Sequence, residues 1–370
     1  MFVENRIRHL VASGEAVTEI IAPVPFFPSA SPWFGSWARY ARIPPREERH
    51  GVAIHHPRFP VIPKLGMPLA PLLLYRASLP ILRRILTRRQ IDVIDAHYMY
   101  PDGVAAVWLG QKLGIPVVVT CRGTDVNLIP RYRIPRRLIQ GAIAGASALI
   151  TVSAALREAV LELGAPPDKV TVLRNGVETR LFAPPPDRLA LRTTLNLSNP
   201  TLISVGHLIE RKGHHLVIEA LQQLPDWDAL IVGDGPERPR LTTLIQSLGL
   251  SGRVRLLGTR PHAELPALYG AADALVLASS REGWANVLLE AMACGTPVVA
   301  TNIWGNPEVV RSPEAGVIVE RNPAGIADGI RRLWANRPDR TATRAYAERF
   351  GWDATTAGQL TLFRRVIAPS

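Results

Sequence analysis

The chain has 370 residues, which is long enough for two domains with complete hydrophobic cores. Its composition, 47% hydrophobic and 20% charged residues, excludes a disordered chain. It has two cysteines, Cys121 and Cys294, so no disulfide framework is expected and a reducing compartment is indicated. No signal-peptide pattern opens the sequence, and no uncharged apolar run reaches the ~18 residues of a transmembrane helix.

The net charge of +12 is uneven along the chain. Residues 1–175 contain 22 Lys and Arg against 12 Asp and Glu, whereas the remainder is nearly balanced. A basic half indicates an acidic partner, either an anionic lipid surface or a lipid-linked phosphate, unless it is only general surface charge. The arginines are scattered among proline-rich loops without a nucleic-acid-binding module, so no nucleic-acid partner is expected.

The first elements depart from the usual order of an α/β domain. Residues 3–14 have helical periodicity and end in Gly14, and residues 17–24 predict a strand. A doubly wound domain normally opens with a strand and a glycine-rich turn. Either the start codon lies upstream or the chain lacks its first strand. A missing strand would leave a gap in the centre of a parallel sheet, which favours an upstream start.

Two features follow that bear on partners. Residues 23–70 are rich in proline and aromatic residues and predict a long surface loop, with a strand within 52–59, of the kind that shapes acceptor binding. Residues 69–89 alternate leucine and isoleucine with arginine. They predict either a basic amphipathic helix on a membrane surface or a domain helix with cations at its C-terminal end.

The rest of the first half alternates strands with helices and therefore predicts a parallel sheet. The expected strands are residues 91–97, 115–120, 148–152 and 170–173, and the helices are 104–113, 136–146 and 154–163. His97 ends one strand, and Arg122 and Asp125 follow the next, so these side chains should lie at the ligand-binding edge of the sheet. His97 could equally be structural. A turn at Asn175-Gly176-Val177 ends the domain, and 182–200 is the expected connection.

The second half repeats this alternation. The expected strands are residues 201–205, 228–232, 254–257, 274–278 and 298–300, and the helices are 214–223, 241–249, 266–271, 287–293, 324–336, 341–350 and 355–367.

Glycines and cations follow the strands of this half. After the first strand come Gly206, His207 and then Arg211-Lys212, and this pair can hold a phosphate through a bidentate guanidinium and a point charge. Turns with Gly233 and with Arg260 follow two further strands. They belong either to the same ligand site or only to the structure of the turns.

Residues 281–301, R-E-G-W-A-N-V-L-L-E-A-M-A-C-G-T-P-V-V-A-T, contain the most informative pattern. Glu282 precedes a predicted helix with Asn286 as its N-cap, and Glu290 lies about one turn inside it. A helix N-terminus binds anions, and carboxylates accept hydrogen bonds from hydroxyls, so the pattern indicates a phosphorylated sugar. The glutamates could instead face water. Glu290, however, lies in an apolar run and should need a partner.

The segment E-G-x-x-N-x-x-x-E-A-M-A-C-G-T-P-V-V-A-T resembles the E-x7-E motif of the retaining GT-B glycosyltransferases, called group 1 or family 4. The resemblance extends less specifically from about Phe2 to the C-terminus. It implies an α/β fold of the GT-B type, with two Rossmann-like parallel-sheet domains facing across a cleft. These would be an acceptor-side domain, 1–180, and a nucleotide-sugar domain, 181–354, with a final helix, 355–370, that packs back on the first.

The resemblance also implies roles for individual residues. Glu290 would bind ribose hydroxyls, Glu282 would lie at the donor sugar, and Arg211 and Lys212 would neutralise the diphosphate leaving group. The remaining donor-site residues implied are Gly206, Gly233, Arg260, Gly283, Trp284, Ala285, Asn286 and Val287. On the acceptor side, the implied residues are His97, with a catalytic role, Arg122 and Asp125. No metal and no cofactor is implied. Two departures are His207, where many relatives have arginine, and Arg122, where many have histidine.

The function implied is transfer of a hexose from a nucleotide sugar, UDP-linked rather than GDP-linked, to a saccharide or lipid-linked acceptor with retention. Relatives of this type commonly work in surface polysaccharide or glycolipid assembly, so a cytoplasmic enzyme is expected, with a peripheral place on the inner face of the membrane as a further option. No nucleophile is evident in the first half, which favours front-face attack over double displacement. The alternatives are a GT-B epimerase or phosphorylase, or a catalytically silent nucleotide-sugar-binding subunit.

Overall fold

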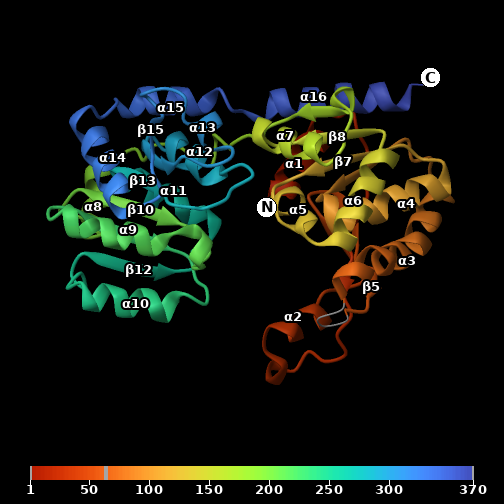
Figure 1. Ribbon diagram of the computed structural model, residues 1–370, viewed down its shortest axis with the longest axis horizontal. Helices are drawn as coiled ribbons and strands as arrows, with labels where there is room; N and C mark the ends of the chain where they lie inside the picture. The colour runs from red at the N-terminus through yellow and green to blue at the C-terminus, as the bar shows by residue number, and fades with distance from the viewer. Residues whose placement is uncertain (1, 62–65, 369–370) are drawn as a thin grey trace. The chain divides into compact units, whose positions relative to one another are not determined.

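The computed structural model describes residues 2–61 and 66–368 (Figure 1). The chain forms two compact units, one of residues 1–173 together with 355–370, and the other of residues 174–354. Residues 174–180 were expected in the first domain. They belong to the second unit because their backbone is tied to it, for example by the Val177 amide, which donates to the carbonyl of Phe350.

The first unit contains a four-stranded parallel sheet in the order β6-β7-β8-β9. Its strands are β6 (Ile94–His97), β7 (Val117–Cys121), β8 (Ala148–Thr151) and β9 (Val170–Val172). The helices that follow them are α4 (Val104–Leu113), α5 (Thr124–Asn127), α6 (Arg133–Gly145) and α7 (Ala154–Glu162). The expected alternation is confirmed. β7 and β8 are buried along their whole length because helices cover both faces of the sheet.

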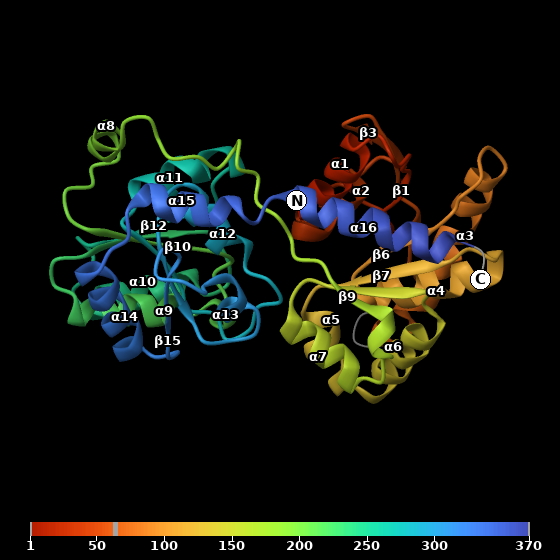
Figure 2. The same ribbon diagram turned by 90° about the horizontal axis from the view of Figure 1, so that it is seen from above.

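Helices from the two ends of the chain cover one face of this sheet. α1 (Phe2–Ala12) and α16 (Trp352–Ile367) lie beside it in two orthogonal views (Figures 1 and 2). Leu10 of α1 and Leu360 and Phe363 of α16 form one buried cluster with Val118 of β7 and Ile150 of β8. The C-terminal residues therefore complete the core of the first unit.

The N-terminal elements form small separate sheets. β1 (Ile20–Ile21), β4 (Val52–His55) and β3 (Arg46–Arg49) make one, in the order β1-β4-β3, and β2 (Val24–Pro25) pairs with β5 (Arg58–Phe59) in another. Between β2 and β3 lies the short α2 (Ala38–Ala41). Within the described residues, no strand joins β1 to β6, so the unit lacks a continuous central sheet.

The helix expected at residues 69–89 is α3 (Gly66–Leu86). Its apolar side chains Leu74, Leu82 and Ile85 are buried, and α3 packs against α4. Arg83 and Arg84 are exposed in its last turn. α3 is thus a helix of the domain core, with cations at its C-terminal end.

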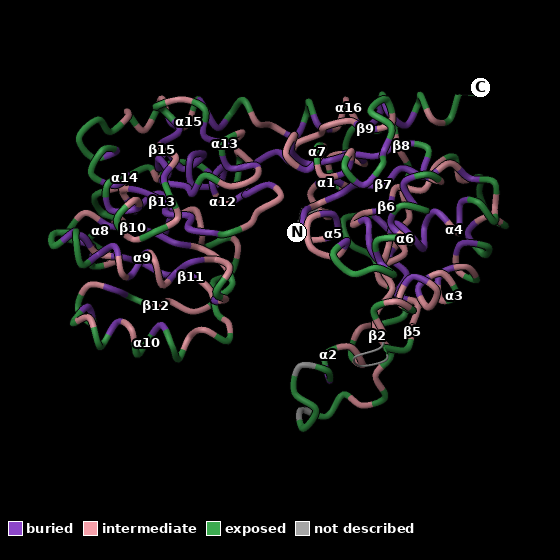
Figure 3. The backbone as a smooth tube through the Cα atoms, in the orientation of Figure 1, coloured by how far each residue is buried: buried purple, intermediate pink, exposed green. Residues whose placement is uncertain are grey.

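The second unit contains a six-stranded parallel sheet in the order β12-β11-β10-β13-β14-β15. Its strands are β10 (Thr201–Val205), β11 (Asp228–Val232), β12 (Val254–Gly258), β13 (Ala274–Leu277), β14 (Val298–Thr301) and β15 (Gly316–Val319). The helices are α8 (Arg188–Thr194), α9 (His214–Ala220), α10 (Arg238–Ser247), α11 (Leu265–Ala271), α12 (Asn286–Ala293), α13 (Asn306–Val309), α14 (Pro323–Ala335) and α15 (Arg340–Glu348). Figure 3 shows the central strands as a buried layer.

Two of these elements were not expected. α8 lies within the predicted connection 182–200, and β15 pairs in parallel with β14 at the sheet edge. α8 buries none of its residues, so it has no apolar face to produce a periodic signal. It is held instead by Asp187, which caps its N-terminus, and by ion pairs from Arg188 and Arg192 to Asp273.

Candidate donor site and first-unit charge network

The strand order of the second unit reverses direction between β10 and β13, which are paired in parallel. In an open parallel sheet, ligands bind at the carboxyl ends of the strands at such a switch point. The segments that leave these two ends are Gly206–Gly213 and Ser279–Ala285, and both contain predicted site residues.

Glycines allow the loops at these strand ends to touch. Gly213 has φ 71°, and a Cβ there would lie 2.1 Å from the carbonyl oxygen of Ala278, the residue after β13. A Cβ on Gly233 would lie 1.9 Å from the carbonyl oxygen of Gly206. No side chain fits at these two positions, so both must be glycine for steric reasons. The sequence alone did not show whether these glycines serve the structure of the turns or a ligand.

Arg211, Lys212 and Glu282 come together at the switch point. The Lys212 ammonium donates a 2.5 Å hydrogen bond to Oε1 of Glu282, which also accepts a 2.7 Å bond from the Ser279 hydroxyl. Arg211 donates to the carbonyl of Arg281 at 2.7 Å, and its Nη1 lies 4.0 Å from Oε2 of Glu282. Two cations and one carboxylate thus share a partly exposed cluster with an excess of positive charge.

Glu290 has the protein partners that its apolar surroundings require. It is 7% exposed on α12, and the Tyr269 hydroxyl donates to its Oε2 at 3.0 Å. Burial, and then the charge of Glu290, raise the pKa of Tyr269 well above its ordinary value, so the phenol stays a donor. Nε2 of His262 lies 3.7 Å from the second oxygen, Oε1, and the His262 ring packs edge-on against Phe182. Sequence reasoning missed Tyr269 and His262, because nothing local marks them as neighbours of Glu290.

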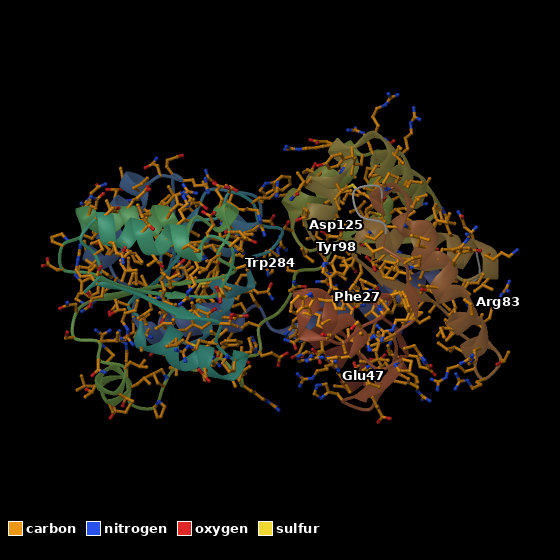
Figure 4. The ribbon with its side chains drawn as sticks, turned by 90° about the horizontal axis from the view of Figure 1, so that it is seen from below. Phe27, Glu47, Arg83, Tyr98, Asp125 and Trp284 are labelled. Atoms are coloured by element: carbon orange, nitrogen blue, oxygen red, sulfur yellow. The ribbon has the colours of Figure 1, made fainter. Side chains whose placement is uncertain are left out.

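The start of α12 differs in one detail from the prediction. Ala285 holds the cap position, and Asn286 is the first helical residue, so Asn286 is not the N-cap. Its side-chain oxygen instead accepts a 3.4 Å hydrogen bond from Asn175, whose own carbonyl accepts from the indole N–H of Trp284 at 3.2 Å. Figure 4 labels Trp284. Asn175 and Trp284 thereby hold the backbone that leads into the free amides of the first turn, at Asn286 and Val287.

The structure also locates Arg260, a predicted donor-site residue, and His207, a departure from the family pattern. Arg260 is at the surface beyond β12, with its guanidinium 3.7 Å from Glu264. His207 is exposed directly after Gly206.

In the first unit, His97 and Arg122 are brought together as predicted strand-end residues. Nδ1 of His97 lies 2.9 Å from Nη2 of Arg122, and its Nε2 lies 3.3 Å from Oδ2 of Asp95. A guanidinium can only donate, so Nδ1 is the unprotonated nitrogen and Nε2 carries the proton. Nε2 lies close to Asp95 but has no hydrogen-bond partner among the described residues. Burial lowers the pKa of His97 and outweighs the opposite effect of the Asp95 carboxylate. The lowered pKa keeps the ring neutral. Arg122 engages Nδ1, the nitrogen that would accept a proton, so this geometry does not present His97 as a free base.

His97 belongs to a longer polar network that no local sequence pattern marks. Oδ2 of Asp95 accepts a 2.7 Å hydrogen bond from Gln359 of α16, and Gln359 accepts a 2.9 Å bond from Nε of Arg6 on α1. Arg6 is 1% exposed, and burial lowers its pKa to about 10. Among the described residues, neither of its Nη atoms has a hydrogen-bond partner.

Asp125 holds backbone rather than offering an open side chain. It is fully buried and accepts hydrogen bonds from the amides of Met99 at 2.7 Å, Gly123 at 2.7 Å and Arg122 at 3.1 Å. It thereby ties the loop after β7 to the end of β6, where Tyr98 has φ 84° (Figure 4). A positive φ is strained for a bulky residue, and the Asp125 bond to the next amide helps to hold it.

Comparison with known proteins identifies the family. Residues 7–181 match the model described as Glycosyltransferase Family 4, and residues 190–350 match Glycosyl transferases group 1. A D-inositol 3-phosphate glycosyltransferase from Frankia alni is 33% identical over 308 residues, which cover 75% of each chain. The chain belongs to the group 1 glycosyltransferases.

Solved structures agree with the fold of this glycosyltransferase. Sucrose-phosphate synthase from Thermosynechococcus elongatus matches with a TM-score of 0.81 at 21% identity, covering 100% of this chain and 93% of the other. HepE from Anabaena, solved in complex with UDP, matches with a TM-score of 0.72 at 25% identity, covering 84% and 86%. The expected fold class, GT-B with two Rossmann-like parallel-sheet domains, is confirmed.

Among residues 2–61 and 66–368, no group of three or more His, Cys, Asp or Glu side chains could hold a metal ion. None of the helices that these residues form is both long and apolar enough for a membrane span.

Proposed function

We propose that this glycosyltransferase moves a hexose from a nucleotide sugar, UDP-linked rather than GDP-linked, to a saccharide or lipid-linked acceptor with retention. The contact between Lys212 and Glu282 carries the proposal. It brings one cation and one carboxylate together where β10 and β13 end. In this proposal the cation would neutralise the diphosphate and the carboxylate would accept hydroxyls of the sugar.

The donor would exchange partners with this pair. A diphosphate next to Lys212 and Arg211 carries more negative charge than one carboxylate, so it would draw the ammonium from Oε1 of Glu282. Glu282 would then be free to accept hydroxyls of the hexose. As the anomeric bond breaks, negative charge grows on the departing phosphate, and the two cations and the α12 amides would stabilise it.

Glu290 would bind the other end of the donor. Its Oε2 is already engaged by Tyr269, so Oε1 is the oxygen that remains for a ribose hydroxyl, with His262 beside it. The preference for UDP is supported by HepE, which was solved with UDP.

We propose front-face attack for the retaining step. His97, Arg122 and Asp125 would lie on the acceptor side, where His97 and Asp125 order the loops and Arg122 offers the charge. Assembly of surface polysaccharide or glycolipid in the cytoplasm is the proposed context. The two thiols, Cys121 and Cys294, are both free, which is compatible with a reducing compartment.

The first test is thermal unfolding with UDP, GDP and ADP. A ligand at 100 times its dissociation constant stabilises by about 2.7 kcal/mol, which is readily measured. A shift with UDP alone is expected, followed by hexose transfer from a UDP-hexose with the anomeric configuration kept, as seen by NMR. Stabilisation by GDP alone would overturn the base assignment. Donor binding without transfer or hydrolysis would favour a silent binding subunit.

Lys212→Ala is the sharper test of the leaving-group role. Loss of one preorganised charge should lower kcat by roughly 100-fold, because it acts where charge develops in the transition state. Lys112→Ala, which removes an exposed lysine of the first unit, is the matched control. Equal kcat in both variants would contradict the assignment.

A further inference from the structure

The segment between β2 and β3 exposes large aromatic side chains. We define the aromatic loop as residues 26–45. Phe26 is 58% exposed, Trp33 92%, Phe34 47% and Trp37 43%. Large aromatic residues are normally buried, and four exposed ones within a single loop mark an interaction surface.

The loop is built around its own contacts. Phe27 packs against Phe34 at 5.3 Å and Trp37 at 6.1 Å between ring centroids, and Trp37 packs on Tyr40 at 5.7 Å. Arg58 of β5 donates to the carbonyls of Tyr40 and Ile43. These contacts give the loop a defined form, so its exposed rings are presented together. In Figure 1 it extends from the β2–β5 end of its unit, and Figure 4 marks Phe27.

A second set of exposed apolar residues leaves the same small sheet. The amide of Phe26 donates to the carbonyl of Phe59 at 2.7 Å, which joins the start of the aromatic loop to the end of β5. Directly beyond lie Val61, 40% exposed, and the first turn of α3 with Met67 and Leu69, each 42% exposed. The exposed apolar surface is therefore formed by two segments, the aromatic loop and the residues that follow β5, and both begin beside the β2–β5 sheet.

Charge indicates which partner fits this surface. The aromatic loop contains Arg39 and Arg42, both exposed, and no Asp or Glu. The exposed Arg46 follows the loop as the first residue of β3 and precedes Glu47 and Glu48. Tryptophan rings prefer the headgroup level of a bilayer, and nearby cations are attracted to anionic lipids. α3 cannot supply the membrane contact by itself, because its apolar side is packed in the core.

We propose that the aromatic loop docks the glycosyltransferase on an anionic lipid bilayer. Trp33, Phe34 and Trp37 insert at the headgroup level, and Arg39, Arg42 and Arg46 pair with lipid phosphates. This goes beyond the proposed function, because membrane docking does not depend on which sugar or nucleotide the second unit binds.

The test is co-sedimentation of the full chain with vesicles of phosphatidylcholine and with vesicles that also contain phosphatidylglycerol. Binding is expected only with phosphatidylglycerol. Trp33→Ala, at the most exposed ring, and the triple variant Trp33→Ala/Phe34→Ala/Trp37→Ala should weaken it, the triple by at least about tenfold. Leu189→Ala, at a side chain 76% exposed in the second unit, is the control and should bind as the unmodified chain does.

A second arm separates charge from apolar contact. Arg39→Gln/Arg46→Gln should weaken binding to the anionic vesicles by about fivefold for each arginine lost. Arg240→Gln, at an exposed arginine of the second unit, is the matched control. Quenching of tryptophan fluorescence by brominated lipid should fall in Trp33→Ala and not in Leu189→Ala.

Other occupants would overturn the proposal. If the aromatic variants bind vesicles normally but change a dimer to a monomer in sedimentation velocity, the loop is a contact between copies. If they bind vesicles normally but lose affinity for a saccharide acceptor, it is an acceptor platform. Failure of the unmodified chain to bind anionic vesicles would reject membrane docking outright.

Discussion

The buried carboxylate of Glu290 has a protein hydrogen bond at one oxygen and keeps the other oxygen available for a ligand hydroxyl. Tyr269 satisfies one of its oxygens, and the other faces His262 at 3.7 Å, beyond a direct hydrogen bond. We expect Glu290→Ala to weaken UDP binding by at least about tenfold, since a hydrogen bond to a charged group is worth roughly 1.5–3 kcal/mol. Tyr269→Phe keeps the carboxylate and should lose less. Isothermal titration calorimetry measures the UDP affinity of both variants. Unchanged affinity in Glu290→Ala would contradict the assignment of Glu290 to the ribose site.

Asp102, two residues before α4, should make the stability of the folded state depend on pH, and the sign of this effect follows from its pKa. Burial raises its pKa to about 6, and the neighbouring Asp125 carboxylate acts in the same direction. The folded state therefore favours the protonated acid, and this contribution to stability is complete below the unfolded pKa near ~4 and is lost as pH rises through about 6. Asp102→Asn imitates the protonated form at every pH.

We therefore expect Asp102→Asn to be more stable than the unmodified protein at pH ~8, by about 1 kcal/mol, and the difference to vanish by pH ~4. Urea unfolding at a series of pH values measures it. The exposed Asp168→Asn controls for the loss of a surface charge. A stability difference that stays constant with pH would show that burial of the Asp102 charge is not its cause.

At the scale of elements, α1 and α16 are linked to β6 by a polar bridge through Gln359. We expect Gln359→Leu to lower the unfolding free energy by about 2 kcal/mol, because it leaves Arg6 and Asp95 buried with fewer partners. Thr361→Ala, two residues along the same helix at an exposed position, is the control. Equal melting temperatures for the two variants would mean that the bridge contributes nothing to stability.

The elements that sequence reasoning found are those with a strong local pattern. β7, β8, α4 and α12 have buried apolar faces, and the turn after α12 has Gly295 at φ 77°, as expected of a helix end. α8 was missed because tertiary ion pairs and not an apolar face hold it. Asn286 was assigned to the N-cap because its residue type suits that position, whereas the contact with Asn175 comes from a distant segment.

At the scale of the whole molecule, the first unit depends on the far end of the chain. Leu360, Leu362 and Phe363 are all at least nine-tenths buried against its sheet. At roughly 1.5–3 kcal/mol for each buried side chain, their removal costs about as much as the entire stability of a typical domain.

A chain that ends at residue 354 should therefore not fold its first unit. Circular dichroism and binding of a hydrophobic dye would show this, and a chain that ends at residue 367, with α16 complete, is the control. A truncated chain with the melting behaviour of the full one would contradict the role of α16 in the core.

The alternation of strands and helices, the parallel sheets and the motif of Glu282 and Glu290 could be predicted from the sequence, because hydrophobic periodicity and turn chemistry are local. Which polar side chains meet depends on the three-dimensional fold. Lys212 and Glu282 are 70 positions apart, and Arg6 and Gln359 are 353 apart. Contacts of this kind depend on strand order and on how helices cover a sheet, which no local pattern encodes.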